Sequence, residues 1–199
     1  MMKYFRHFLL LLVISVFSTT AYSQVDVRAT GGNLAQSYTT LKAAFDAINA
    51  GTHTGTITIG ISASTAETAS AILNGSGSGP ASYTSILISP SGGGARSISG
   101  AIPAGSPIID LNGADNVTID GVNSGGNTLT ISNTATPGSY EGTSTIRFIA
   151  DATGNTITRC TVLGNGSIPC YTGCVIYFST GITTGNDNNT ISSCLIGPA

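Results

Sequence analysis

The chain has 199 residues, of which only 8% are charged, and its formal net charge is −2 at pH 7. Nucleic acids and anionic membranes attract clustered Lys and Arg, so the scarcity of basic residues argues against both as partners. Glycine, serine, threonine and asparagine supply the polarity instead, and these residues suit short strands joined by tight turns.

Residues 1–23 have the pattern of a secretory signal peptide. Lys3 and Arg6 precede the apolar run Phe8–Phe17, and Ala21-Tyr22-Ser23 fits a cleavage site. The apolar run is short for a permanent transmembrane helix, so we favour a cleaved signal over the alternative of an uncleaved anchor. We therefore expect export through the Sec pathway, a secreted or cell-surface location, and no membrane segment after cleavage.

An N-terminal segment, residues 24–55, contains the one good helix signal, between Tyr38 and Gly51. Thr39 or Thr40 is placed to cap its start, and Gly51 stands at the position after its end. Four apolar residues recur with helical spacing on one face: Leu41, Ala44, Phe45 and Ile48. Such a helix is typical of the cap that covers the first coil of a solenoid.

The remaining segment, residues 56–199, is predicted to form solenoid coils of short strands. Apolar and β-branched runs alternate there with turns rich in Gly, Asn and Asp, and no second helix of useful length is predicted. The absence of a second helix signal excludes a βαβ sheet and leaves a β-sandwich or a parallel β-helix. We predict strands at 56–61, 71–73, 83–88, 96–99, 107–111, 116–119, 128–131, 145–149, 155–157, 161–163, 175–178, 189–191 and 194–196.

An internal repeat decides between these two architectures. The stretch from Asn155 to Val162 returns 34 residues later as Asn189 to Ile196, and a looser copy begins 39 residues upstream at Asn116. Strand-forming units at such a period are typical of solenoids, whose loops absorb insertions. We therefore predict an all-β parallel β-helix in which Ile, Phe, Cys and Asn side chains stack on their own kind in successive coils.

These residues resemble the N-terminal part of the right-handed, pectin-lyase-like parallel β-helix family. The helix from Tyr38 to Ile48 is similar to the N-terminal cap of that family, and the Asn-Thr-Ile segments are similar to its coils. More narrowly, the stretch from Leu111 to Gly121 resembles large secreted surface proteins of the Bacteroidetes type, which often end in a sorting domain for type IX secretion. The resemblance implies a right-handed solenoid and specifies fold far better than activity.

All four cysteines lie in the last 40 residues, and export makes disulfides permissible. Cys160 and Cys194 are equivalent in the repeat, so we expect them to stack in neighbouring coils, as a disulfide or as two buried thiols. Cys170 and Cys174 lie in one loop and are placed to close it. Sequence spacing alone leaves the pairing open.

Asp110, Asp115 and Asp120 form the densest group of carboxylates. Carboxylates at this density suit acid–base chemistry on a glycan, or a Ca²⁺ site at Asp115 and Asp120. The alternative is turn chemistry, because Asp115 precedes Asn116 and Asp120 precedes Gly121. We favour turn chemistry and expect no cofactor, since a spacing of five along adjoining strands does not by itself bring side chains together.

Resemblance to lyases implies a further need for a basic residue that removes the proton beside a uronate carboxylate. Arg147 and Arg159 are the basic residues within the coils, and with Asp115 and Asp120 they define one conceivable catalytic cleft. Neither arginine recurs in the next coil, so the repeat itself does not require them, and we expect both to point outward.

From these patterns we expect a non-catalytic, exported β-helix segment that acts as an adhesin-like surface or carbohydrate-binding scaffold, with a polysaccharide or a cell-surface glycan as its partner. The alternative is the N-terminal part of a polysaccharide lyase or glycoside hydrolase whose catalytic coils lie beyond residue 199. A coil that ends after a strand exposes unpaired backbone groups, so we expect further coils or another chain to cover the edge that follows residue 196.

Overall fold

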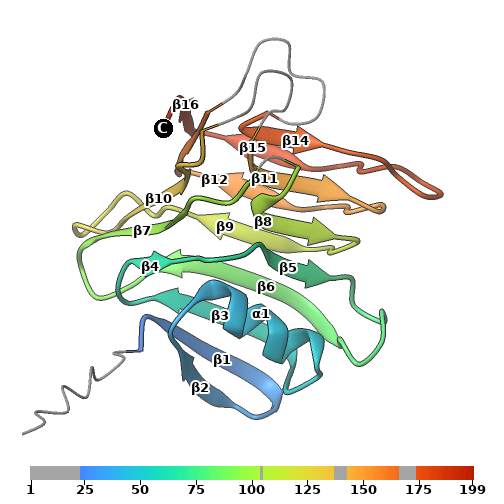
Figure 1. Cartoon of the computed structure of the whole chain (residues 1–199). Coiled ribbons are helices and arrows are strands. Elements are labelled where there is room, and N and C mark those ends of the chain that lie inside the picture. Colours follow the sequence, from blue (N-terminus) through green and yellow to red (C-terminus); the bar gives the residue numbers. More distant parts are fainter. Residues whose placement is uncertain (1–22, 104, 137–142, 166–173) are drawn as a thin grey trace, which may run out of the picture.

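Three sheets run along the molecule, and each coil of the chain adds one strand to each of them (Figure 1). The computed structural model describes residues 23–103, 105–136, 143–165 and 174–199. It forms a mostly parallel β-solenoid of about four turns, which confirms the predicted fold class. No helix within these residues is long and apolar enough to cross a membrane.

Every strand predicted from the sequence is present, with bounds that move by up to three residues. The first sheet has the order β15 (Thr190–Ser192), β12 (Thr156–Thr158), β9 (Val117–Asp120), β6 (Tyr83–Pro90), β3 (His53–Ile61), β1 (Val25–Gly32) and β2 (Ala35–Tyr38). The second has the order β16 (Leu195–Gly197), β13 (Thr161–Gly164), β10 (Thr128–Asn133), β7 (Ala95–Gly100) and β4 (Thr65–Ala66). The third has the order β14 (Ile176–Phe178), β11 (Ser144–Ile149), β8 (Pro107–Asn112) and β5 (Ala71–Asn74).

The predicted ladders of like side chains occupy the interior. Ile157 pairs in register with both Ile119 and Ile191, and Phe148 pairs with Phe178. The two phenylalanine rings stack with centroids 4.6 Å apart and planes 6° from parallel. Stacking like on like lets each coil bury the apolar face of the one before it, which is how a solenoid builds a continuous core.

The looser copy of the repeat is shifted by one residue from the predicted alignment. Val117, rather than Asn116, lies at the position of Asn155, 38 residues apart. Asn116 instead corresponds to Gly154 and Asn188, and all three adopt left-handed φ values of 57°, 68° and 55°. Asn and Gly tolerate this conformation better than other residues, so the prediction matched the right residue type to the wrong position in the turn.

A helix and a hairpin cover the first coil. Strand β1 pairs antiparallel with both β2 and β3, and α1 (Leu41–Asn49) packs mainly against β5. The hairpin was not predicted, although Val25 and Val27 alternate with polar residues and are buried. Segment 24–55 therefore contributes two strands and the start of β3 as well as the helix.

The ends of α1 are held by specific hydrogen bonds. Thr40 is the N-cap and accepts from the Ala43 N–H at 3.1 Å. Gly51 has φ +74°, and the N–H groups of Gly51 and Thr52 donate to the carbonyls of Ile48 and Ala47, a Schellman arrangement. The predicted start and stop signals of the helix are both confirmed.

A carboxylate from the solenoid body completes the helix N-terminus. Glu67 is 3% exposed, and its two oxygens accept from the N–H groups of Leu41 (2.9 Å) and Lys42 (3.1 Å). A carboxylate at this position satisfies helix donors that lack intrahelical partners and complements the helix dipole. Glu67 therefore fastens the capping helix to the coil that it covers.

Candidate functional site

Asp110 and Arg147 form an ion pair across two adjacent coils of the third sheet. Arg147 in β11 lies in register with Asp110 in β8. Its Nε and Nη2 donate to the two carboxylate oxygens at 2.9 and 2.7 Å, and its Nη1 donates to the Gly105 carbonyl at 3.2 Å. The Asp110 side chain is 5% exposed, and its bonds raise the pKa of Arg147. The guanidinium is therefore occupied by groups of its own chain.

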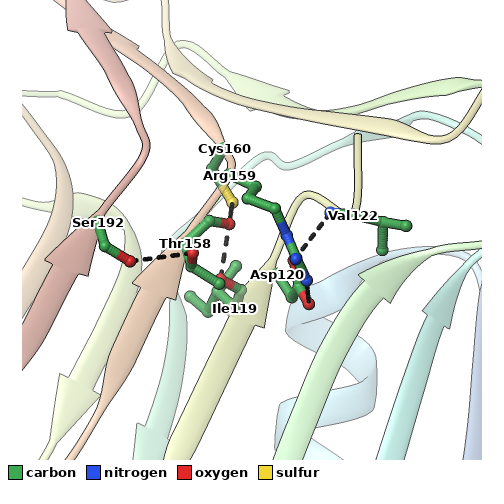
Figure 2. A network of polar contacts seen from close by, with 7 residues as sticks. All are labelled: Ile119, Asp120, Val122, Thr158, Arg159, Cys160 and Ser192. Atoms are coloured by element: carbon green, nitrogen blue, oxygen red, sulfur yellow. Dashed lines mark hydrogen bonds and ion pairs between the residues drawn. The ribbon is translucent and has the colours of Figure 1, made fainter. Parts of the chain in front are cut away.

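Asp120 and Arg159 repeat this arrangement where strands β9 and β12 of the first sheet end (Figure 2). Arg159 Nε donates to Asp120 Oδ1 at 2.9 Å, its Nη2 donates to Oδ2, and Oδ1 also accepts from the Val122 N–H at 2.8 Å. The hydrogen bond from Arg159 is the main reason why the pKa of Asp120 lies below its usual value. Asp120 therefore stays ionised and closes the turn that follows β9.

Two loop aspartates accept backbone N–H groups from the following coil. Asp115 accepts from Thr153 at 2.7 Å. Desolvation acts to raise the pKa of Asp151, but hydrogen bonds from the backbone amides of residues 182–185 together lower that pKa. These contacts agree with turn chemistry as the role of the recurring loop aspartates.

The four residues of the conceivable catalytic cleft, Asp115, Asp120, Arg147 and Arg159, take part in three separate contacts. The structure brings Asp120 to Arg159, but it joins Arg147 to Asp110 and Asp115 to the Thr153 amide. The Arg147 pair lies in the third sheet, whereas the Arg159 pair follows strands of the first sheet. The described residues contain no group of three or more His, Cys, Asp or Glu side chains placed to hold a metal ion.

Asparagine side chains join the turns of successive coils. Asn155 is 1% exposed; its Oδ1 accepts from the Val117 N–H at 2.9 Å, and its Nδ2 donates to the Ala114 carbonyl at 2.8 Å. Asn189 does the same one coil later, accepting from the Asn155 N–H at 2.9 Å and donating to the Ala152 carbonyl at 2.8 Å. The expected asparagine ladder is present, and each amide reaches back to the preceding coil.

Cys160 and Cys194 occupy equivalent positions and are both thiols. Cys160 Sγ lies 3.7 Å from the Ile119 carbonyl oxygen, and Cys194 Sγ lies 3.6 Å from that of Ile157 (Figure 2 shows the first contact). Burial raises the pKa of Cys160 to about 12, whereas Cys194 is half-buried. Cys174 is also half-buried, and Cys170 lies outside the described residues.

His53 is a buried residue whose partners the sequence does not reveal. Its Nδ1 donates to the Asn33 carbonyl at 2.6 Å, and its Nε2 shares a hydrogen bond of 2.7 Å with the Tyr38 hydroxyl. The ring is 0% exposed. These bonds tie the β1–β2 hairpin to the start of β3.

An open hollow of about 290 Å³ lies on the N-terminal strands of the first sheet. Hydroxyl and charged side chains surround it, and Gly60 leaves its floor without a side chain. Its lining residues are Asp26, Arg28, Thr58, Gly60, Ser89 and Ser91. Arg28 is exposed there, and the carboxylate of Asp26, whose pKa is lowered mainly by the Ser37 hydroxyl and in part by the Arg28 charge, lines the same hollow.

No protein-family model, curated protein or solved structure matches the chain.

Proposed function

We propose that this chain is a non-catalytic, exported scaffold of a secreted or cell-surface protein. The observation that carries the proposal is that the arginines of the coils are paired with aspartates of neighbouring coils. Both arginines of the conceivable catalytic cleft bind aspartates of the preceding coil through two donors each. Export is supported by the signal-peptide pattern of residues 1–23.

The protonation states of these pairs suit structure better than proton transfer. A general base must be deprotonated at the working pH before it can accept a proton, yet the ion pairs raise the pKa of both Arg147 and Arg159. A general acid must hold a proton, yet the pKa of Asp120 is lowered. Arg147, Arg159 and Asp120 therefore stay charged, which suits ion pairs that hold neighbouring coils together.

For the ligand of the scaffold, we propose a carbohydrate with acidic groups. Supporting this choice is the hollow beside Arg28, where one exposed guanidinium lies with the Asp26 carboxylate and the hydroxyls of Thr58, Ser89 and Ser91. A guanidinium pairs with a carboxylate through two donors, and hydroxyl groups bind sugar hydroxyls in either hydrogen-bond direction.

A panel of neutral and acidic polysaccharides tests both parts of the proposal. We expect no release of unsaturated or reducing products, and saturable binding of an acidic member that Arg28→Ala weakens. Lys42→Ala is the matched control, because it removes an exposed positive charge from α1. Binding that is unaffected by Arg28→Ala would refute the hollow as the site.

Turnover would contradict the scaffold itself. Product release that is abolished in Arg159→Ala, with a thermal melt close to that of the unmodified protein, would favour a polysaccharide lyase or hydrolase instead. Arg159 is the better residue for this test than Arg147, because its side chain is 48% exposed and its loss disturbs the core least.

A further inference from the structure

The last coil presents the interior ladders of the solenoid to solvent. Ile191 and Ile196 are 37% and 46% exposed, whereas Ile157 and Val162, their partners one coil earlier, are 0% exposed. Phe178 is likewise 46% exposed although it stacks on the fully buried Phe148. Large apolar side chains that are exposed on the last strand of all three sheets are typical of an interaction surface.

We call this surface the β14–β16 edge. Strands β14, β15 and β16 are the last strands of their three sheets, and they lie together at one end of the molecule in Figure 1. Its ladder residues are Phe178, Asn189, Ile191, Cys194 and Ile196. Edge strands pair through their backbone on one side and offer the other side to a further strand.

The asparagine ladder determines the orientation in which a further strand would fit the β14–β16 edge, parallel to β15. From one coil to the next, the Asn side chain of the later coil binds two backbone groups of the earlier coil. It accepts from one N–H, and it donates to the carbonyl of the residue three positions before that N–H. On the β14–β16 edge the groups at these two positions are the Asn189 N–H and the Asn186 carbonyl, which accepts from Asn189 Nδ2 at 3.0 Å and has its second lone pair left for a further donor. They match the side chain of an asparagine that arrives on a strand parallel to β15.

We propose that the β14–β16 edge binds a β-solenoid coil of the same repeat, in parallel register, with an aromatic residue on Phe178, asparagine on Asn189, and aliphatic residues on Ile191 and Ile196. The interface already formed between the last two coils contains all four of these contacts, and a further coil would continue it. The inference names a partner for the proposed scaffold, but it depends on coil geometry and not on carbohydrate binding.

A second copy of the chain fits this edge less well. The opposite end of the solenoid is covered by α1, which packs on β5, and by the β1–β2 hairpin, so a copy stacked head to tail cannot continue all three sheets. A copy related by a two-fold axis reverses every strand. It would exchange the second and third sheets and could not place Phe on Phe, Asn on Asn and Ile on Ile together.

The test is binding of a synthetic peptide with the sequence of residues 175–199 to the purified protein under reducing conditions. We expect saturable binding, and amide exchange of β14, β15 and β16 slowed by about tenfold or more while β2, the other edge strand of the first sheet, is unchanged. A control peptide that carries Asn189→Asp and Ile191→Lys should bind about tenfold more weakly or not at all.

Variants of the protein locate the binding surface. Ile191→Lys and Ile196→Lys should each weaken binding of the unmodified peptide, whereas Leu34→Lys, at an exposed apolar residue of the opposite end, should not. Thermal melts establish that each variant is folded. Absent binding, equal binding of the control peptide, or protection of the edge by concentration-dependent dimerisation without peptide would each overturn the proposal. Failure here leaves the polysaccharide assays unchanged, so the two proposals are tested separately.

Discussion

Asn189 Oδ1 accepts hydrogen bonds from both the backbone N–H and the side-chain Nδ2 of Asn155, at 2.9 and 3.0 Å. The side chain of Asn155 in turn reaches back to the Val117 N–H and the Ala114 carbonyl. One buried amide therefore contacts three consecutive coils, and it satisfies groups that water cannot reach.

Replacement of Asn155 tests this chain of amides. Asn155→Ala leaves a buried N–H and a buried carbonyl without partners, so we expect a loss of about 2–4 kcal/mol in the free energy of unfolding. Asn155→Asp should cost at least as much at pH 7, because a carboxylate cannot donate to the Ala114 carbonyl. Urea denaturation measures both. The matched control is Asn123→Asp at an exposed position, which should change stability by less than about 0.5 kcal/mol.

The Asp110–Arg147 pair is expected to be strongly coupled. Arg147→Ala leaves a carboxylate that is 5% exposed without its cation, and we expect a cost of about 2–3 kcal/mol. A double-mutant cycle with Asp110→Ala measures the coupling free energy. The Lys42–Asp46 pair, with side chains 39% and 56% exposed, serves as control and should show about 0.5 kcal/mol or less. Equal coupling in both pairs would contradict the proposed structural role of Asp110 and Arg147.

The Asp120–Arg159 pair should make stability depend on acid pH. The folded-state pKa of Asp120 lies below the unfolded value of 3.8, so its contribution is complete above about pH 4 and is lost as pH falls through the folded pKa. The stability difference between the unmodified protein and Asp120→Asn should therefore shrink on acidification through this range. Urea denaturation between pH 7 and pH 2.5 checks it. Arg159→Ala removes the same pair and should give the same trend; a difference that is constant with pH would refute it.

Thiol labelling should separate the two stacked cysteines. Burial raises the pKa of Cys160 to about 12, so at pH 8 almost none of it is thiolate, the form that reacts. We expect an alkylating reagent to modify the half-buried Cys194 in the native protein, and to modify Cys160 only on unfolding. Peptide mass mapping reports each cysteine separately. Rapid native labelling of Cys160 would mean that this side chain does not face the interior.

Glu67 is expected to anchor the capping helix. Glu67→Gln loses the charge at the helix N-terminus and one of two acceptors, at a cost of about 1 kcal/mol, and Glu67→Ala should cost about 2 kcal/mol. Thermal and urea denaturation measure the effect. Thr40→Ala removes the N-cap and should also cost about 1 kcal/mol, whereas its exposed neighbour Thr39 should tolerate alanine. Equal stability of all four variants would show that the helix end needs no cap.

Local patterns were sufficient to predict most of the fold. The strands at 56–61 and 83–88 alternate with period two, and the segments after Asn155 and Asn189 repeat, so both their type and their stacking follow from short stretches of sequence. The β1–β2 hairpin was not predicted, because its second strand, Ala35–Tyr38, has no buried residue and therefore no alternation of apolar and polar residues. The one-residue error at Asn116 arose because Asn occupies two neighbouring positions of the turn in different coils.

The candidate site was predicted only in part. The sequence indicates that aspartates recur in the loops and that Arg147 and Arg159 are not required by the repeat. It does not indicate that Arg147 binds Asp110, because their contact joins residues 37 apart and depends on the number of loop residues between β8 and β11. The partners of His53 and Glu67 depend in the same way on how the cap is folded against the first coil.

By itself, the sequence determined the repeating interior of this protein, because Ile, Phe, Cys and Asn recur at fixed strand and turn positions and each can bury its side chain only by stacking on the next. Only the tertiary structure decided what the few charged residues do. Coulombic and hydrogen-bond contacts act over a few ångströms, and loop lengths and strand register determine which groups come that close. Those contacts pair the aspartates and arginines of the coils with one another.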